Sequence, residues 1–373
     1  MRGLALEGGG AKGAYQIGVA QALMDSGYEF AGFVGTSIGA INAAMLAQGS
    51  LDAALEIWRN ISTEKIFYKD LLKKIISDKG IGTDKIKAVL EQCIDENKIR
   101  ASGKDFGLVT ISLSGLKPHR LMLEDIPQGQ LVNYIMASAS FPGFRSETIG
   151  NAAFLDGAFY DNCPYGLLCD KDYDEVIAVR TNATGIFRKV KDSQIVKTIA
   201  PREDLGSMMR FSRQRSERNI KLGYYDGLRF VKCLLGISYY INPVDINDFY
   251  SRLIYLNDGV ILEAGRLMGI ADMPAKRMLF EKIIPQLGTY LSLGRDYDYA
   301  DFVIAMLEIA AKKRDLERFK VYDYEELCAI VREKPVKAQH EKRPYLLSDR
   351  SALHRKKAAI DLLTDELIIT EKE

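Results

Sequence analysis

A glycine-rich junction near the N-terminus places the strongest constraint on the fold. The apolar residues Leu4–Leu6 predict a strand, and Ala14–Met24 repeats apolar residues at helical spacing. The junction between them consists of Gly8, Gly9, Gly10, Ala11, Lys12 and Gly13. Successive glycines let the backbone turn sharply and come close to a bound group, because no Cβ is in the way. The helix that follows directs free N–H groups and a positive dipole end into the same space. The junction therefore predicts an anion-binding loop between a strand and a helix.

A second strand-to-helix junction carries a candidate nucleophile. Phe30–Val34 predicts a strand and Ile38–Leu46 predicts a helix. Between them stand Gly35, Thr36, Ser37, Ile38 and Gly39. This is a G-x-S-x-G nucleophile elbow in the context that the motif requires, with glycines that permit the turn raising the Ser37 Oγ above the sheet edge. The N–H of Ile38 then lies where an oxyanion would form. We predict Ser37 as the nucleophile and Ile38 as an oxyanion-hole donor.

The candidate acid or base is Asp156, which follows the apolar pair Ala153-Phe154 and precedes Gly157 and Ala158. An aspartate at a strand end with glycine behind it is placed where a turn exposes its carboxylate to a neighbouring loop. An Asp-Gly pair alone more often marks a simple hairpin turn. Its catalytic value therefore depends on which other residue can activate Ser37.

The chain offers few alternatives to Asp156 as a general base. A serine hydroxyl needs an adjacent base, and the only histidines are His119, His340 and His354. The last two lie in a charged C-terminal stretch that predicts a solvated surface. His119 stands in a turn-like setting beside cationic residues and remains a second candidate. A Ser–Asp dyad is the more economical interpretation, although it requires burial or a strong oxyanion hole, because the ordinary pKa of Asp is only about 3.9.

The glycine loop also satisfies the dinucleotide fingerprint G-x-G-x-x-G, so a nucleotide site is an alternative. Glu29 stands about 20 residues further on, where an acid could bind a ribose. However, it precedes the second predicted strand instead of ending it. A Walker A loop is excluded because Lys12 is followed by Gly13 and not by Ser or Thr.

Strands alternating with helices predict an α/β fold with a mostly parallel sheet covered on both faces. Later strands are expected at Phe106–Leu113 and Glu175–Val179, and after about Asn182 the chain turns to amphipathic helical patterns, the first at Leu205–Leu222. We therefore divide the chain into a catalytic α/β domain, residues 1–182, and a mainly helical region, residues 183–373, a candidate cap over the active site.

Composition narrows the classes of partner. The chain has 51 Lys and Arg against 50 Asp and Glu, a net charge of +1, which argues against nucleic-acid binding. The five cysteines are scattered without a C-x-x-C, so neither a disulfide framework nor a zinc site is expected, and no metal or cofactor is predicted. The chain shows no signal peptide and no apolar run of the roughly 18–20 residues that a membrane span needs. We expect a cytoplasmic protein whose membrane contact, if any, is peripheral.

A basic run lies on the helix predicted after the catalytic half. Its members are Arg202, Arg210, Arg213, Arg215, Arg218 and Lys221. These cations either hold anionic lipid headgroups or form a solvated helix face paired with Glu203, Asp204 and Glu217, and the second interpretation is the stronger one.

The combined motifs resemble those of the patatin-like phospholipase family. The resemblance rests on Glu7–Ala14 with Gly18, on Gly35–Ala43, on Ala137–Phe144 and on Asp156–Ala158 with Asn162 and Pro164. It spans about half of the chain, from Leu4 to Val179. Lys12 stands where many members have Arg, and Ala158 where many have a second Gly.

The resemblance implies a three-layer α/β/α fold and a Ser–Asp dyad that cleaves acyl esters of lipids such as phospholipids or lysophospholipids through an acyl-enzyme. It implies Ser37 as the nucleophile, Asp156 as the proton acceptor, and the N–H groups of Gly8, Gly9 and Gly10 as the oxyanion hole. A catalytically weak lipid-binding or regulatory protein on the same fold remains the alternative.

Overall fold

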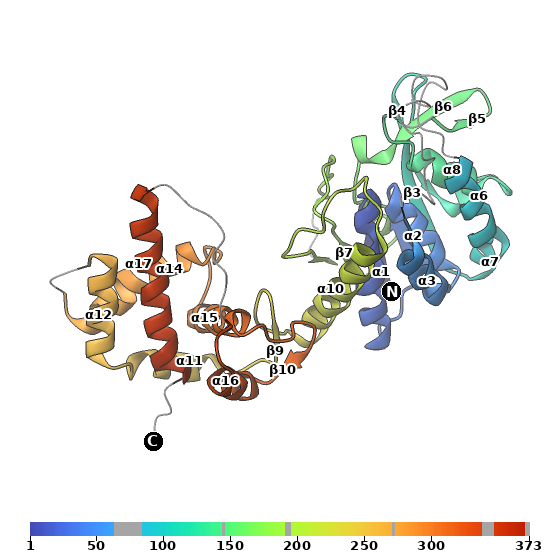
Figure 1. Ribbon diagram of the computed structural model, residues 1–373. Helices are drawn as coiled ribbons and strands as arrows, with labels where there is room; N and C mark the ends of the chain where they lie inside the picture. The colour runs from blue at the N-terminus through green and yellow to red at the C-terminus, as the bar shows by residue number, and fades with distance from the viewer. Residues whose placement is uncertain (63–83, 144–145, 191–194, 271–272, 338–346, 370–373) are drawn as a thin grey trace. The chain divides into compact units, whose positions relative to one another are not determined.

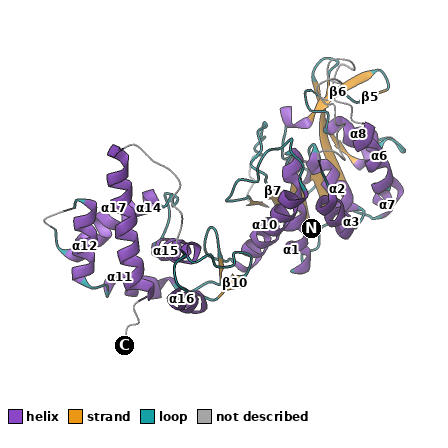
Figure 2. Cartoon of the chain, in the orientation of Figure 1, coloured by secondary structure: helices purple, strands orange, loops and turns teal. Residues whose placement is uncertain are grey.

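The computed structural model describes residues 1–62, 84–143, 146–190, 195–270, 273–337 and 347–369. The chain divides into two compact units, Met1–Val231 and Lys232–Glu373 (Figure 1). Unit 1 holds a central sheet, and unit 2 is mainly helical (Figure 2). Each unit is described by itself.

The sheet of unit 1 follows the strand order β5-β6-β3-β2-β1-β7-β8, with β4 beside β3. Its strands are β1 (Arg2–Leu6), β2 (Gly32–Gly35), β3 (Asp105–Ser112), β4 (Lys117–Met122), β5 (Thr148–Ile149), β6 (Ala152–Asp156), β7 (Glu175–Val179) and β8 (Val196–Ile199). The run from β3 to β8 is parallel, whereas β4, β5 and β6 pair antiparallel. The central strands are buried on both faces, which explains their continuous apolar sequences. The prediction of a mostly parallel sheet is confirmed.

Helices cover one face of this sheet. They are α2 (Ile38–Ala47), which contacts β1, β2 and β3, with α1 (Ala14–Asp25) and α3 (Leu51–Asn60) packed beside it and α10 (Arg213–Lys232) packed on α1. The opposite face is covered by α9 (Gly166–Cys169) and the segments around it, where Leu167, Leu168 and Tyr173 pack against inward residues of the strands. The unit therefore has the three layers that were predicted. The remaining helices of this unit are α6 (Asp84–Cys93), α7 (Glu96–Ala101) and α8 (Leu131–Ser138), with short turns η1 (Gly10–Gly13), η2 (Leu123–Asp125) and η3 (Gly157–Phe159).

Helix α10 packs against α1 through glycines. A Cβ on Gly18 would lie 2.0 Å from the carbonyl oxygen of Ile220, and a Cβ on Gly223 would lie 2.0 Å from that of Tyr15. Only glycine allows two helix backbones to approach this closely. Because α10 and the edge strand β8 both pack on the sheet unit, residues 183–231 belong to unit 1, although the sequence placed them with the helical region.

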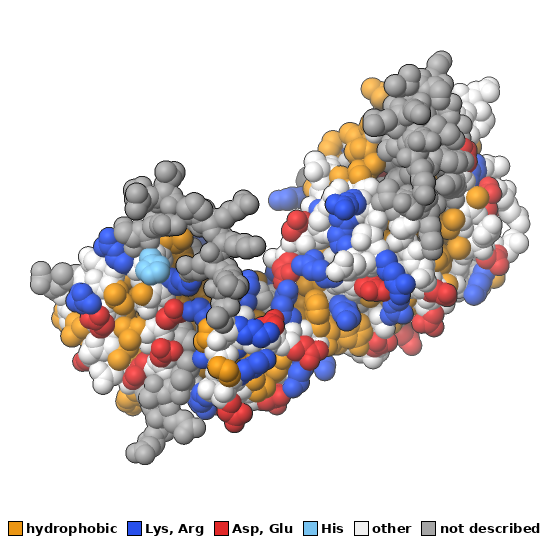
Figure 3. Space-filling view, in the orientation of Figure 1, with side chains coloured by type: hydrophobic (Ala, Val, Ile, Leu, Met, Phe, Trp, Pro, Cys, Tyr) orange, Lys and Arg blue, Asp and Glu red, His pale blue; other side chains and the backbone are white. Residues whose placement is uncertain are grey.

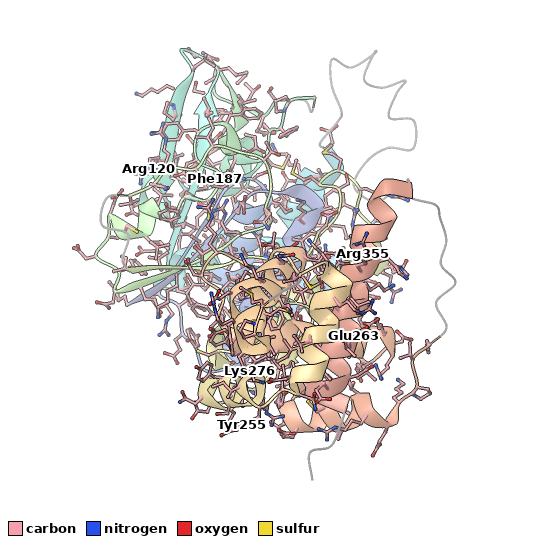
Figure 4. All side chains as sticks on the ribbon, turned by 90° about the vertical axis from the view of Figure 1, so that its left-hand side faces the viewer. Arg120, Phe187, Tyr255, Glu263, Lys276 and Arg355 are labelled. Carbon is pink, nitrogen blue, oxygen red and sulfur yellow. The ribbon has the colours of Figure 1, made fainter. Side chains whose placement is uncertain are left out.

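Unit 2 is built from helices around an apolar core that includes Phe249, Phe302 and Leu363. Its elements are α11 (Ile246–Ile254), α12 (Asp258–Met268), α13 (Ala275–Met278), η5 (Leu279–Ile283), α14 (Ile284–Tyr290), α15 (Tyr299–Lys313), α16 (Tyr324–Glu333), α17 (Leu347–Thr364) and η6 (Asp365–Ile369), with β9 (Tyr240–Ile241) and β10 (Val321–Tyr322). At its surface, Lys276 of α13 pairs with Asp258 of α12 at 3.1 Å (Figure 4). Among the described helices, none has an apolar stretch long enough to cross a bilayer.

Candidate active site

The glycine loop turns where no other residue type would fit. Gly9 and Gly10 have φ angles of 153° and 55°, in the region that favours glycine. A Cβ on Gly9 would lie 2.5 Å from Thr181 Oγ1, and one on Gly10 would lie 2.3 Å from the carbonyl oxygen of Met208. The strand, loop and helix predicted from the sequence are therefore present, and neighbouring segments close around the loop.

Glu7, which lies between β1 and the glycine loop, holds the start of that loop in place. Its fully buried carboxylate pairs with Arg180 at 2.9 Å and accepts hydrogen bonds from the N–H groups of Thr181 and Ala183 and from Asn162 Nδ2. These bonds tie the end of β1 to the segment after β7, so the loop is held from both sides. No role was predicted for Glu7. An acidic residue directly after a fully apolar strand is the signal that a buried partner must be present.

The backbone N–H groups of the loop differ in their availability. Gly8 donates to the carbonyl oxygen of Asn162 at 2.9 Å, so its N–H is already used. The N–H groups of Gly9, Gly10 and Ile38 donate to no other residue in the described ranges. The other members of the motif stabilise the loop itself. Ala11 donates to Met208 at 2.7 Å, and the Lys12 ammonium donates to the Asn182 carbonyl at 3.1 Å.

Ser37 sits at the elbow between β2 and α2 with φ 57° and ψ −128°, an unusual conformation for a residue with a side chain. A Cβ on Gly35 would lie 2.2 Å from the backbone of Gly39, and one on Gly39 would lie 2.2 Å from the carbonyl oxygen of Leu6. These two contacts explain both glycines of the motif.

Ser138, at the end of α8, supports the elbow and was not predicted. Its Oγ accepts a hydrogen bond from the Ser37 N–H at 2.9 Å and donates to the Val109 carbonyl at 2.7 Å. Ser138 stands in the Ala137–Phe144 stretch that carries the family resemblance, but no role was predicted for it, because only the tertiary fold brings it to the elbow.

Asp156 ends β6 and is almost completely buried. Its Oδ1 accepts a hydrogen bond from the Ala158 N–H at 2.8 Å, while the buried Oδ2 accepts none from the residues that the structure describes. Burial raises the pKa of Asp156 to about 6. The Ala158 N–H and the Ser37 hydroxyl lower this pKa, but their effect is smaller than that of burial. Gly157 is required because a Cβ there would lie 2.1 Å from the Val109 carbonyl oxygen.

A cavity of about 350 Å³ joins these residues, since Gly9, Gly10, Ser37, Ile38 and Asp156 all contribute to its wall. The rest of the wall is mainly apolar and includes Ile41, Met45, Ile57, Trp58, Leu90, Phe141, Met208, Met209 and Phe211. The structure thus brings the predicted nucleophile, the predicted base and two glycines of the loop to one apolar cavity.

The histidines lie elsewhere. His119 is on β4, where its ring packs against Phe154 at 5.8 Å between centroids, and it does not line the cavity. His354 is exposed in unit 2, and His340 lies outside the described residues. The candidate ribose ligand Glu29 is exposed before the start of β2, whereas the glycine loop follows the end of the parallel strand β1, so the two lie at opposite ends of these strands. In the described ranges, no three His, Cys, Asp or Glu side chains form a group that could hold a metal ion.

Comparison with known proteins agrees with this architecture. Residues 4–168 match the model of the patatin-like phospholipase family. The match covers the part of the chain that carries the sequence motifs, and it confirms the resemblance that they indicate.

An uncharacterized NTE family protein of Mycobacterium tuberculosis is 30% identical over 183 residues, which cover 48% of this chain and 49% of that protein. A counterpart in Mycobacterium bovis has the same identity and coverage. The chain thus spans about half the length of the curated relatives it matches. Among solved structures, VipD from Legionella pneumophila aligns with a TM-score of 0.40 and 13% identity over 99% of this chain and 91% of its own. The type III effector ExoU aligns with a TM-score of 0.29 and 14% identity over 96% and 93%.

Proposed function

We propose that this protein is a serine acyl hydrolase that cleaves ester bonds of lipids through a Ser37–Asp156 dyad. The observation that supports it best is the shared cavity, in which a serine at a strained elbow and a buried carboxylate meet an otherwise apolar wall.

In the first step, Asp156 accepts the proton of the Ser37 hydroxyl while Oγ bonds to the ester carbonyl carbon, giving a tetrahedral oxyanion. The oxyanion then collapses, the ester C–O bond breaks, and Asp156 returns the proton to the departing alcohol. Water hydrolyses the acyl-enzyme by the same sequence, again with Asp156 as base. A raised pKa makes Asp156 a stronger base than an ordinary aspartate, yet one that is mostly ionised at neutral pH.

The proposed oxyanion donors are the N–H groups of Gly9, Gly10 and Ile38. They have no acceptor in the described part of the chain, whereas the Gly8 N–H is bound to Asn162 and is left out. Each such donor contributes on the order of 3–4 kcal/mol to transition-state stabilisation.

The apolar cavity fits the acyl chain of a lipid, with phospholipids and lysophospholipids as the substrate class. Exposed apolar residues lie near it: Val89 and Met209 line the cavity and are exposed, and the exposed Phe159 packs against the lining residue Phe141 at 5.7 Å between ring centroids. We call Val89, Phe159 and Met209 the apolar rim. An exposed apolar patch beside a lipid site is suited to peripheral contact with a membrane surface.

A fluorophosphonate probe tests the dyad directly. We expect wild-type protein to be labelled and to hydrolyse lipid esters, and Ser37→Ala to lose both properties. Asp156→Asn should lose at least about a hundredfold in kcat/KM, the usual contribution of a general base. Labelling that persists in Ser37→Ala would refute the nucleophile, and undiminished hydrolysis in Asp156→Asn would refute the base. A wild-type protein that binds lipid without turnover would favour the non-catalytic alternative.

A further inference from the structure

The loop between β8 and α10 is fixed beside the candidate active site. Met208, Met209 and Phe211 line the cavity, and the Met208 carbonyl accepts the Ala11 N–H at 2.7 Å. Phe211 stacks on Trp58 at 6.3 Å between centroids. Asn219 of α10 holds the start of the loop through the Leu205 carbonyl at 3.0 Å. Side chains on this loop therefore have a defined position relative to the cavity.

Two cations of the basic run are neutralised by partners. Arg213 pairs with Glu217 at 3.0 Å, and Arg218 pairs with Glu203 at 2.7 Å. These two pairs agree with the prediction of a solvated helix face with internal ion pairs. On the surface shown in Figure 3, basic and acidic side chains are likewise mixed.

Arg210 and Arg215 have no such partner among the described residues. The Arg215 guanidinium lies against Gly206, where a Cβ would be 2.9 Å from Nη1, and its buried Nη2 has no acceptor in the described ranges. Burial lowers the pKa of Arg215, the charge of Arg210 lowers it further, and Asp204 opposes both. The Asp204 carboxylate is directed instead to the Gly206 N–H at 2.8 Å. The charges of Arg210 and Arg215 thus act on each other, and neither guanidinium has an ion-pair partner among the described residues.

We propose that Arg210 and Arg215 bind the phosphate group of a lipid substrate whose acyl chain occupies the cavity. Guanidinium groups match phosphate oxygens with paired hydrogen bonds, and a phosphate removes the repulsion between two adjacent arginines. Met209 and Phe211, the sequence neighbours of Arg210, line the cavity that also holds Ser37, so the loop that carries Arg210 borders the proposed acyl site. This inference rests on the proposed function and adds the two residues that would bind the phosphate group of its substrate.

The kinetic test compares a lysophosphatidate with a monoacylglycerol of the same acyl chain at fixed ionic strength. Arg215→Gln and the double variant Arg210→Gln/Arg215→Gln should lower kcat/KM for the phosphate ester by about tenfold or more, and leave the neutral ester within about twofold. Arg213→Gln is the matched control, because it removes the same charge from a paired position on the same helix, and it should change neither substrate. An equal loss on both substrates would overturn the proposal in favour of a structural role, and so would an unchanged phosphate ester.

A binding test separates this inference from the proposed function, because it needs no turnover. Titration of the Ser37→Ala protein should show lysophosphatidate binding at least about tenfold more tightly than monoacylglycerol, with the difference lost in Arg215→Gln. Inorganic phosphate alone should bind weakly. Equal affinity for inorganic phosphate and lysophosphatidate would overturn the headgroup assignment, leaving a site for free phosphate. If binding follows the expectation while wild type hydrolyses neither ester, the arginine site stands and the hydrolase proposal fails.

Discussion

At the scale of single residues, the proposed chemistry depends on how Asp156 is buried. One of its oxygens is held by the Ala158 N–H, and the other accepts no hydrogen bond within the described ranges. The environment favours the neutral carboxyl, which raises the pKa to about 6. In the proposed dyad the serine has no histidine beside it, so we expect burial to supply the basicity that an ordinary aspartate lacks.

The pH dependence of hydrolysis should report this carboxyl. Because the base must be ionised, we expect kcat/KM for a soluble ester to rise with pH up to about 6 and then level off, falling about tenfold per unit below it. Burial also raises the pKa of Asp161 to about 6, although Asp161 does not line the cavity. Asp161→Asn is therefore the control and should keep the acidic limb. A limb that disappears in Asp161→Asn would contradict the assignment to Asp156.

The same pKa predicts a cost in stability. The folded-state pKa of Asp156 is above the unfolded value of 3.8, so its contribution to stability is present below pH 3.8 and lost as the pH rises through about 6. The ionised, buried carboxylate then costs about 3 kcal/mol. Asp156→Asn should therefore raise the thermal midpoint relative to wild type more at pH 8 than at pH 4.5. The exposed Asp52→Asn should show no such difference, and an equal shift at both pH values for Asp156→Asn would contradict the expectation.

The sequence motifs predicted the positions where the backbone is strained, but not the residues that stabilise those positions by hydrogen bonds. Gly9, Gly35 and Gly39 are recognisable because the backbone geometry there excludes other residues. Ser138 reaches the elbow only through the packing of α8 on the sheet, and its motif Ala137–Phe144 does not indicate a contact with a residue 101 positions away. The roles of Ser37 and Asp156 remain predictions, while their meeting at one cavity is a structural observation.

At the scale of elements, α2 connects the elbow to the depth of the cavity. Ile38, Ile41 and Met45 line the cavity along one side of this helix, starting from Ser37 at its N-terminal end. The rise from Ser37 to Met45 is about 12 Å at about 1.5 Å per residue. An extended polypeptide spans at most about 3.6 Å per residue over three backbone bonds, or about 1.2 Å per bond. We take the same advance per bond for an extended acyl chain. The helix therefore provides a wall for about ten carbons.

Activity should depend accordingly on acyl length. Within a series of esters differing only in chain length, we expect an optimum at about ten carbons. Met45→Ala should shift this optimum by about three carbons, because the substitution removes about three heavy atoms of side chain from the cavity wall. Met122→Ala removes a buried methionine that does not line the cavity, and should destabilise the protein without moving the optimum. An unchanged profile in Met45→Ala would mean that the acyl chain does not follow α2.

The helix predicted from Leu205 begins only at Arg213. Gly206 has φ 86° and breaks the helical pattern, and the following residues turn toward the glycine loop, where Met208 accepts the Ala11 N–H. Apolar periodicity cannot distinguish a helix face from a loop whose apolar side chains line a cavity. The difference matters because this loop carries Met209 and Arg210.

At the scale of the whole molecule, we expect the apolar rim to bring the proposed active site to a membrane surface. Met209 is 42% exposed beside the cavity. Met209→Glu should weaken binding to lipid vesicles by about tenfold, because the apolar area that enters the lipid interface is replaced by charge. Hydrolysis of a soluble short-chain ester should change little. Leu116→Glu is the control, since Leu116 is 69% exposed but does not line the cavity, and equal effects of the two variants in a vesicle sedimentation assay would argue against the rim.

The close packing of α1 against α10 limits where the chain can be divided into fragments. A fragment ending at residue 182 would leave the glycine groove of α1 open to water and would turn β7 into a bare sheet edge, because β8 and α10 would both be missing. Open edges of this kind recruit other chains. Residues 1–231, the range of unit 1, keep the contacts between α1 and α10 and the β7–β8 pair, and are therefore the better starting point for expressing the proposed catalytic part by itself.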